Sequence, residues 1–215
     1  MLNIPFIKEA LSFYYELNDS ESHGYQHLDE VYDLAMKMKE KLDIEIPNKI
    51  IAITAYTHDM FSSINRDLHH ELGYKYVLDT SVFFLNELHS NDRYLIACAI
   101  REHRASYKGE YTSILSELIS AADRGIPDIK KIVIRSYKYA IETNPNANEF
   151  TLYSLVRKHM IEKFSTNGYA RYNNLYNKYF ETELKEMRSF FDNISVKDIE
   201  NIVKEKNNGW NTRSL

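Results

Sequence analysis

A histidine followed directly by an aspartate is the pair of residues in this sequence best suited to chemistry. His58 and Asp59 stand at the end of an apolar run that covers residues 50–57. A carboxylate that follows a buried helix is costly unless a cation pairs with it. Imidazole nitrogens and carboxylate oxygens are both good ligands for divalent transition metals. The pair therefore indicates a metal site at the end of a buried helix.

Further residues of ligand type occur on other predicted helices. His23 and His27 are four residues apart, so on a helix they project from one face. Asp123 ends another apolar helical stretch, and a short connection at residues 43–48 lets the helix with His27 pack antiparallel to the helix that ends at His58. One histidine, the His-Asp pair and the distant aspartate would form a mixed nitrogen and oxygen shell with open positions for water and substrate.

The elements that must position these residues are helices. The chain has 215 residues but only 6 glycines and 4 prolines, and its apolar residues recur at helical rather than alternating spacing. We therefore predict an all-α fold, a compact helical bundle with additional C-terminal helices. Helices are expected over residues 5–17, 28–42, 47–57, 69–87, 92–103, 112–123, 127–141, 149–164, 175–190 and from 196 onward.

The length favours one main domain with an appendage. We expect a metal-binding helical core over residues 1–145, which ends at an Asn-Pro-Asn break, and a C-terminal helical extension over residues 146–206 that packs on this core. Residues 207–215 are polar and are expected to fray. Ser195 and Asp198 have the spacing of a capping box at the start of the last helix.

Charge and composition restrict the class of protein. Lysine and arginine total 27 against 31 aspartates and glutamates, and this net charge of −4 argues against a dedicated nucleic-acid binder. No apolar stretch approaches the roughly 20 residues of a membrane span, and residues 1–10 lack a signal-peptide pattern. The single cysteine, Cys98, excludes an intramolecular disulfide and has the apolar neighbours of a buried side chain. We expect a soluble, cytoplasmic protein with no membrane partner.

The order and helical setting of these residues resemble the HD-domain superfamily of metal-dependent phosphohydrolases, over residues 22–128. The residues that carry the resemblance are His27 in His-Leu-Asp-Glu-Val, the pair His58-Asp59, His103, and Asp123 in Ala-Ala-Asp-Arg-Gly. The resemblance implies an all-helical fold and one or two divalent metals, with Mn²⁺, Fe²⁺, Co²⁺, Ni²⁺, Zn²⁺ and Mg²⁺ all admissible. It also implies action on nucleotides or other phosphate esters.

The resemblance also guides the assignment of ligands. The expected metal ligands are His27, His58, Asp59 and Asp123. His27 comes just before the residues at which apolar side chains recur along its helix, as the family ligand does, so we take it as the metal ligand. His23 is then expected to support a ligand or to face the substrate. Binuclear relatives place histidines between the His-Asp pair and the last aspartate.

Three histidines are candidates for such a second metal. His69 and His70 are neighbours on a predicted helix and diverge by about 100°, so at most one of them faces the site. We prefer His70, together with His103, as ligands of a second metal.

A bound divalent metal lowers the pKa of water from 15.7 to about 7 and so supplies a nucleophile at neutral pH. Asp59 could bind the metal with one oxygen and orient the water with the other. His103 could protonate the leaving oxygen or bind phosphate; alternatively, it is a neutral histidine that supports the ligands. The candidates for binding phosphate charge are Arg104, Lys108, Arg66 and Arg124, with a solvated surface role as the alternative for Lys108.

A tyrosine-rich stretch lies near the Asn-Gly turn at residues 167–168. Tyr172, Tyr176 and Tyr179 have helical spacing, which is typical of a packed helix face. Tyr169 and Arg171 are the members that we consider for a ligand. His89 and His159 are expected to be solvated or structural, and neither is given a role.

We predict a metal-dependent phosphohydrolase that acts on a small nucleotide-like phosphate ester or anhydride, because mild negative charge and a compact size suit a small-molecule enzyme. One alternative is a non-catalytic helical module that holds the metal as a structural clip and binds a nucleotide or a protein. In a third interpretation there is no metal, and the histidines and aspartates cap helices in a polar core. A face of the C-terminal helices is available for contact between copies of the chain.

Overall fold

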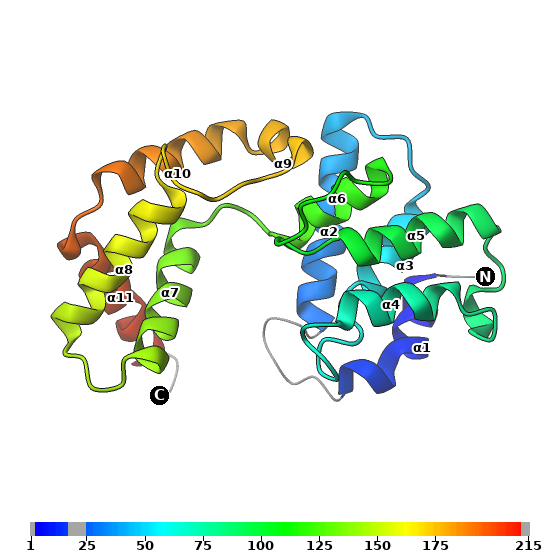
Figure 1. The fold of residues 1–215 in the computed structure, drawn as a ribbon, viewed down its shortest axis with the longest axis horizontal. Coiled ribbons are helices and arrows are strands. Elements are labelled where there is room, and N and C mark those ends of the chain that lie inside the picture. The colour runs from blue at the N-terminus through cyan, green and yellow to red at the C-terminus, as the bar shows by residue number, and fades with distance from the viewer. Residues whose placement is uncertain (1–2, 17–24, 212–215) are drawn as a thin grey trace. The chain divides into compact units, whose positions relative to one another are not determined.

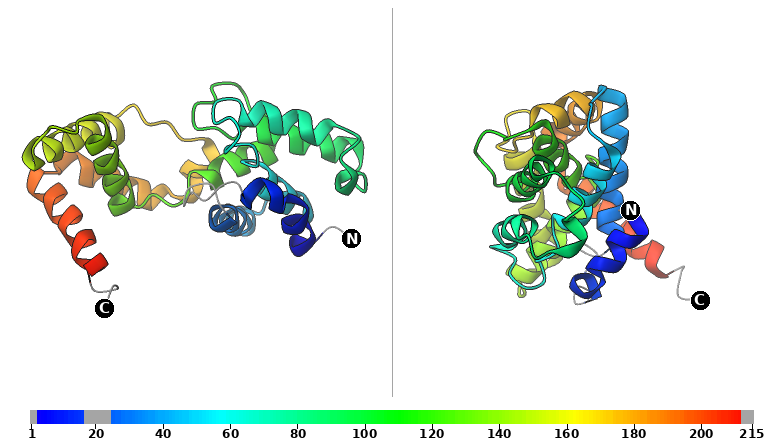
Figure 2. Two further views of the ribbon diagram at one scale, coloured as in Figure 1. Left: turned by 90° about the horizontal axis from the view of Figure 1, so that it is seen from below. Right: turned by 90° about the vertical axis from the view of Figure 1, so that its right-hand side faces the viewer.

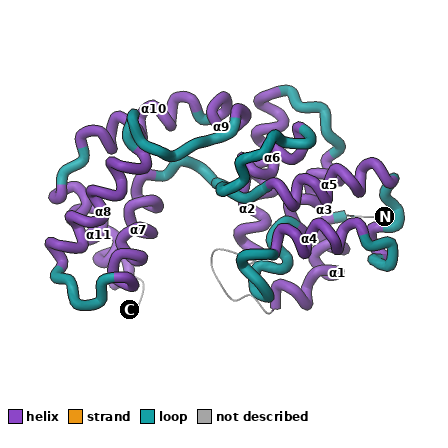
Figure 3. Tube along the Cα trace, in the orientation of Figure 1, coloured by secondary structure: helices purple, strands orange, loops and turns teal. Residues whose placement is uncertain are grey.

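The computed structural model describes residues 3–16 and 25–211 of the chain. Within these residues the structure consists of helices, turns and loops, with no strand (Figures 1 and 3). The all-α prediction is therefore confirmed. The helices are α1 (Ile4–Glu16), α2 (Tyr25–Leu42), α3 (Asn48–Thr57), α4 (His69–Leu78), the 3-10 helix η1 (Phe83–Leu85), α5 (Ser90–Glu102), α6 (Ile114–Asp123), α7 (Ile129–Thr143), α8 (Glu149–Phe164), α9 (Asn174–Tyr179), α10 (Glu181–Asn193) and α11 (Val196–Asn211).

The chain divides into two compact units. Unit 1 consists of residues 1–125 together with residues 172–179, and unit 2 consists of residues 126–171 and 180–215. This division differs from the expected core at residues 1–145, because α7 packs on α8 and α11 and so belongs to unit 2. Conversely, α9 packs on α6 and α2, which places this late segment in unit 1.

The central helix of unit 1 is α3. Every residue from Ile50 to Thr57 is buried, as expected for a helix that is apolar on all sides. Four helices pack on it, namely α1, α2, α5 and α6. Figure 2 shows the ribbon from two further directions. The hydroxyls of Thr54 and Thr57 donate to the carbonyls of Ile50 and Ile53, each at 2.7 Å. These bonds satisfy the buried hydroxyls within the helix itself.

A close helix contact positions the start of α4. A Cβ atom added at Gly73 would lie 2.7 Å from the Cγ2 atom of Ile100 on α5. The missing side chain therefore allows α4 to approach α5 closely. Helix α4 ends at Leu78, earlier than the expected helix over residues 69–87. The side chain of Asp79 accepts the backbone N–H of Ser81 at 2.8 Å, and this local bond favours a turn over continued helix.

Unit 2 is built from α7, α8, α10 and α11, and its core includes Val156, Met160 and Phe191. The expected capping box opens α11, since the Ser195 N–H donates to the Asp198 carboxylate at 2.8 Å and the Asp198 N–H donates to the Ser195 hydroxyl at 3.1 Å. The backbone of α11 stays helical to residue 211, whereas fraying was expected from residue 207.

The long helix expected over residues 175–190 is interrupted. Phe180 separates α9 from α10 with a non-helical backbone and a buried ring. The interruption coincides with the boundary between the two units. Tertiary packing rather than a local breaker ends α9, because neither glycine nor proline occurs there.

Candidate metal centre

The last turn of α3 fixes the position of His58. Backbone carbonyls at a helix C-terminus lack partners within the helix, and here each finds another donor. The Thr54 carbonyl accepts the His58 N–H at 3.0 Å, and the Ala55 carbonyl accepts the Nδ1–H of the His58 ring at 2.8 Å. The Tyr56 carbonyl accepts the hydroxyl of Tyr15 from α1 at 3.0 Å. The imidazole is therefore held by its own helix, with Nε2 directed away from that bond.

A first group of ligand atoms gathers in front of this ring. The group consists of His27 from α2, His58 and Asp59 from the end of α3, and Asp123 from the end of α6, with one ligand atom of each within 4.8 Å of the others. Asp123 Oδ1 lies 3.1 Å from His27 Nε2 and 3.4 Å from His58 Nε2. Two ligands of one ion at about 2.0–2.2 Å are at most about 4.4 Å apart. These separations therefore suit binding to a common ion.

A second group shares Asp59 with the first. Asp59 Oδ1 lies 3.1 Å from His69 Nε2 and 3.4 Å from His103 Nε2. The two Nε2 atoms of His69 and His103 are 3.2 Å apart. All three side chains are buried. Asp59 thus spans both groups, because its other oxygen, Oδ2, lies 3.8 Å from His58 Nε2.

Three of the histidines have the same hydrogen-bond arrangement. The Nδ1–H groups of His58, His69 and His103 donate to the carbonyls three residues earlier, at 2.8, 2.7 and 2.6 Å. A neutral imidazole with Nδ1–H presents a lone pair on Nε2, which is the atom available to a metal. Two such lone pairs that face each other at 3.2 Å repel unless a cation or a proton lies between them.

The donor set fits a divalent metal. His58 Nε2 is buried and has no hydrogen-bond partner, and a buried polar atom of this kind is costly unless something binds it. The side chains of His27 and Asp123 are 17% and 22% exposed, whereas those of Asp59 and His69 are almost fully buried. Solvent therefore reaches the first group from the side of His27 and Asp123.

The electrostatics of the first group are dominated by its two aspartates. Burial lowers the pKa of His58, but the carboxylates of Asp59 and Asp123 outweigh this effect and raise it to about 9. Burial raises the pKa of Asp123, but its contacts with His27 and His58 outweigh burial and hold the pKa well below its usual range. Without a metal, a protonated His58 ring and an ionised Asp123 carboxylate are therefore favoured, and the two form an ion pair.

Two arginines each directly follow a candidate ligand in sequence. The Arg104 side chain, next to His103, donates to the Asp67 carbonyl at 2.8 Å. The Arg124 side chain, next to Asp123, donates to the Ala105 carbonyl at 3.4 Å, and its buried Nε has no hydrogen-bond partner. Both guanidinium groups are therefore tied to loops that adjoin the ligand-bearing helices.

The other candidates for phosphate binding are on the surface. Arg66 and Lys108 are exposed. The backbone of Arg66 has a contact of its own, since its carbonyl accepts the His69 ring. No described contact joins either side chain to the two groups of ligands. The solvated alternative for Lys108 agrees with its exposure.

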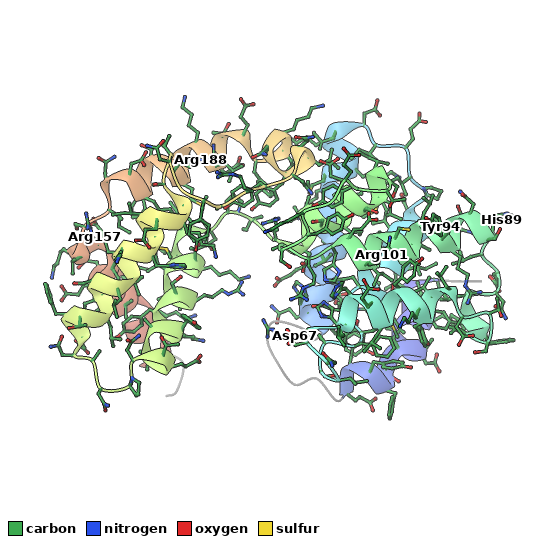
Figure 4. The ribbon with its side chains drawn as sticks, in the orientation of Figure 1. Asp67, His89, Tyr94, Arg101, Arg157 and Arg188 are labelled. Atoms are coloured by element: carbon green, nitrogen blue, oxygen red, sulfur yellow. The ribbon has the colours of Figure 1, made fainter. Side chains whose placement is uncertain are left out.

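Several histidines lie outside the two groups. His23 falls outside the described residues. His70 belongs to neither group, so the structure places His69, rather than the preferred His70, beside His103. Burial and the nearby Arg104 guanidinium lower the pKa of His70. His89 is exposed at the start of α5 (Figure 4), and His159 lies on α8 in unit 2.

The tyrosine-rich stretch is shared between the two units. Tyr176 is buried in unit 1, stacks on Tyr172 with ring centroids 4.8 Å apart and donates to the Gly125 carbonyl at 2.9 Å. Tyr169 and Arg171 lie in unit 2, where the Arg171 side chain donates to the Gly168 carbonyl at 2.8 Å.

The helices that carry both groups of ligands match a known protein family. Residues 24–125 match the family described as the HD domain. This part of the chain belongs to the HD-domain superfamily. The superfamily is one of metal-dependent phosphohydrolases, and the His/Asp groups of this HD domain could hold a divalent metal. None of the curated proteins and none of the solved structures compared with the chain gives a significant match.

Two helices of unit 1 lie outside the residues that match the HD-domain family but contact the helices that do. Helix α1 precedes it and α9 follows it, yet both pack on matched helices. In the part of the chain that the structure describes, no helix is both long and apolar enough to span a membrane.

Proposed function

We propose that this HD domain is a hydrolase that uses a divalent metal to cleave a small phosphorylated substrate, a nucleotide or a related phosphate ester or anhydride. The observation that carries the proposal is the convergence of His27, His58, Asp59 and Asp123 from three separate helices, with His58 Nε2 buried and without a hydrogen-bond partner. Such a buried donor set is costly without a cation.

These four side chains would hold one metal ion, and Asp59, His69 and His103 would hold a second. A bound divalent metal supplies Lewis-acid polarisation of a phosphoryl oxygen and a water of lowered pKa. The partial exposure of His27 and Asp123 supports entry of substrate from their side. His103 is nearly fully buried, so we assign it to metal binding rather than to protonation of the leaving group.

The chain's own residues would perform the remaining tasks. Asp59 has one oxygen toward each group of histidines, so it can fix both groups and accept a hydrogen bond from the attacking water. Arg104 and Arg124 would balance the negative charge of the phosphoryl group, because a guanidinium binds phosphate oxygens bidentately. Their attachment to loop carbonyls limits the side-chain entropy lost on binding.

The test is a screen for turnover with the reloaded protein. Metal is removed with a chelator, then Mn²⁺, Co²⁺, Ni²⁺ or Mg²⁺ is added, and nucleoside mono-, di- and triphosphates are assayed for release of phosphate or pyrophosphate. We expect Asp59→Ala to abolish release. Asp67→Ala is the matched control, because it removes the same charge from an exposed residue outside both groups (Figure 4).

The outcomes separate the proposal from its alternative. Release that persists in Asp59→Ala would refute the role of Asp59. Metal that raises the melting temperature without turnover of any phosphate ester would instead favour a non-catalytic module with a structural metal.

A further inference from the structure

Helix α1 lies outside the HD-domain match, yet it contacts the turn that carries His58 and Asp59. Tyr15, near the end of α1, is buried and donates its hydroxyl to the carbonyl of Tyr56 at 3.0 Å. This carbonyl precedes His58 by two residues. It adjoins the Ala55 carbonyl, which holds the His58 ring. The hydroxyl of Tyr15 therefore completes the set of donors that fixes the last turn of α3.

The ring of Tyr56 is held as well as its backbone. Its hydroxyl donates to the carboxylate of Asp29 on α2. Asp29 also forms an ion pair with Lys8 of α1 at 2.7 Å, and the ammonium group of Lys8 lies 5.3 Å from the centre of the Tyr56 ring. Helices α1 and α2 therefore hold this residue from two sides, directly before the His-Asp pair.

We propose that Tyr15 is a positioning residue of the metal centre, through which α1 fixes the orientation of the His58 ring and the Asp59 carboxylate. This inference rests on the proposed metal site. If the Tyr56 carbonyl loses its donor, the last turn of α3 keeps its bonds to Thr54 and Ala55 but is held less firmly, and the ligand atoms shift from the separations that suit one ion. Outer partners of metal ligands typically change metal affinity by about 10- to 100-fold. Because Tyr15 acts through the backbone, we expect the lower end, about 10-fold.

The test compares two tyrosine-to-phenylalanine variants whose hydroxyls join α1 to different helices. Tyr15→Phe removes the bond to the Tyr56 carbonyl and keeps the buried ring, so the circular dichroism spectrum should stay helical. Tyr25→Phe is the matched control. It removes a bond of similar length, 2.9 Å, from the Tyr25 hydroxyl to the Lys8 carbonyl, which joins α1 to α2 rather than to the last turn of α3.

Co²⁺ is the probe for full-length protein freed of metal, because its visible absorption reports ligand geometry without any need for turnover. We expect Tyr15→Phe to bind Co²⁺ about 10-fold more weakly with an altered spectrum, and Tyr25→Phe to match the wild type in both. Wild-type affinity and spectrum in Tyr15→Phe would overturn the inference and leave the proposed function standing. Equal losses in both variants would also overturn it, since they would indicate a general effect of loosening α1. A wild-type protein that binds no Co²⁺ would overturn the metal site itself.

Discussion

The pairing of His58 with the aspartates has a direct consequence for the metal-free protein. The pKa of His58 is raised from 6.5 to about 9 in the folded state. Its contribution to stability is therefore complete below pH 6.5 and is lost as the pH rises through about 9. Asp123 has a lowered pKa, so its contribution is present above its ordinary value of 3.8 and is lost as the pH falls below that value. Both contributions are present together between about pH 3.8 and pH 6.5, so the metal-free protein should be most stable in this range.

The size of the effect follows from the shift of His58. One pKa unit corresponds to about 1.4 kcal/mol, so this shift corresponds to about 3 kcal/mol of folding free energy. The shifts of His58 and Asp123 include the same contact at 3.4 Å and are not added together. For a protein of this size, a loss of about 3 kcal/mol lowers the melting temperature by on the order of 10 °C.

The assay is thermal unfolding in the presence of a chelator at closely spaced pH values from 6 to 9.5. We expect the melting temperature to fall over this range in the wild type and to change much less in His58→Gln. With metal present the trend should reverse, because protons and metal compete for the same Nε2 atom and the gain from metal grows with pH. A chelated wild type whose melting temperature is level or rises over this range would refute the electrostatic reasoning.

Two further substitutions test neighbouring features. His69→Ala should weaken binding of a second metal equivalent in a titration by at least the roughly 100-fold upper end seen for outer partners of ligands, because the structure places His69 itself in the second group. His70 lies outside both groups, so His70→Ala should bind like the wild type, and the reverse result would restore His70 as the ligand. Gly73→Ala should lower the free energy of unfolding in urea by about 1–3 kcal/mol, since the added methyl would lie 2.7 Å from Ile100. Gly109→Ala is its control, because the methyl there meets the tip of a tyrosine side chain, and equal losses in both variants would contradict the packing argument.

Much of the HD domain follows from local patterns in the sequence. The bounds of α3 and α6 were predictable because apolar residues fill each helix and a polar ligand type ends it. The structure brings together His27, the His-Asp pair and Asp123, as expected from their placement at helix ends. The types of the ligand residues and the helical spacing of the apolar residues thus predict the bounds of these helices and the convergence of the first group of ligands.

Other features depend on contacts that no local pattern contains. The choice between His69 and His70 depends on the rotation of α4, which the close contact at Gly73 sets. The Arg66 carbonyl that holds the His69 ring is equally invisible in the sequence. The bond from Tyr15 joins a side chain to a backbone carbonyl 41 residues away. Backbone acceptors carry no signature of residue type, so such a partner is found only in three dimensions.

The return of residues 172–179 to unit 1 affects how the protein is made. Tyr176 and Asn173 bond to carbonyls of Gly125 and Glu117, so this late segment completes a surface formed by residues synthesised far earlier. A nascent chain that has just emerged to the end of the HD-domain match would still lack this covering. The first unit therefore finishes folding only after much of the second has left the ribosome. A fragment cut at the family boundary would carry the candidate ligands but expose the side of α6 that α9 normally covers.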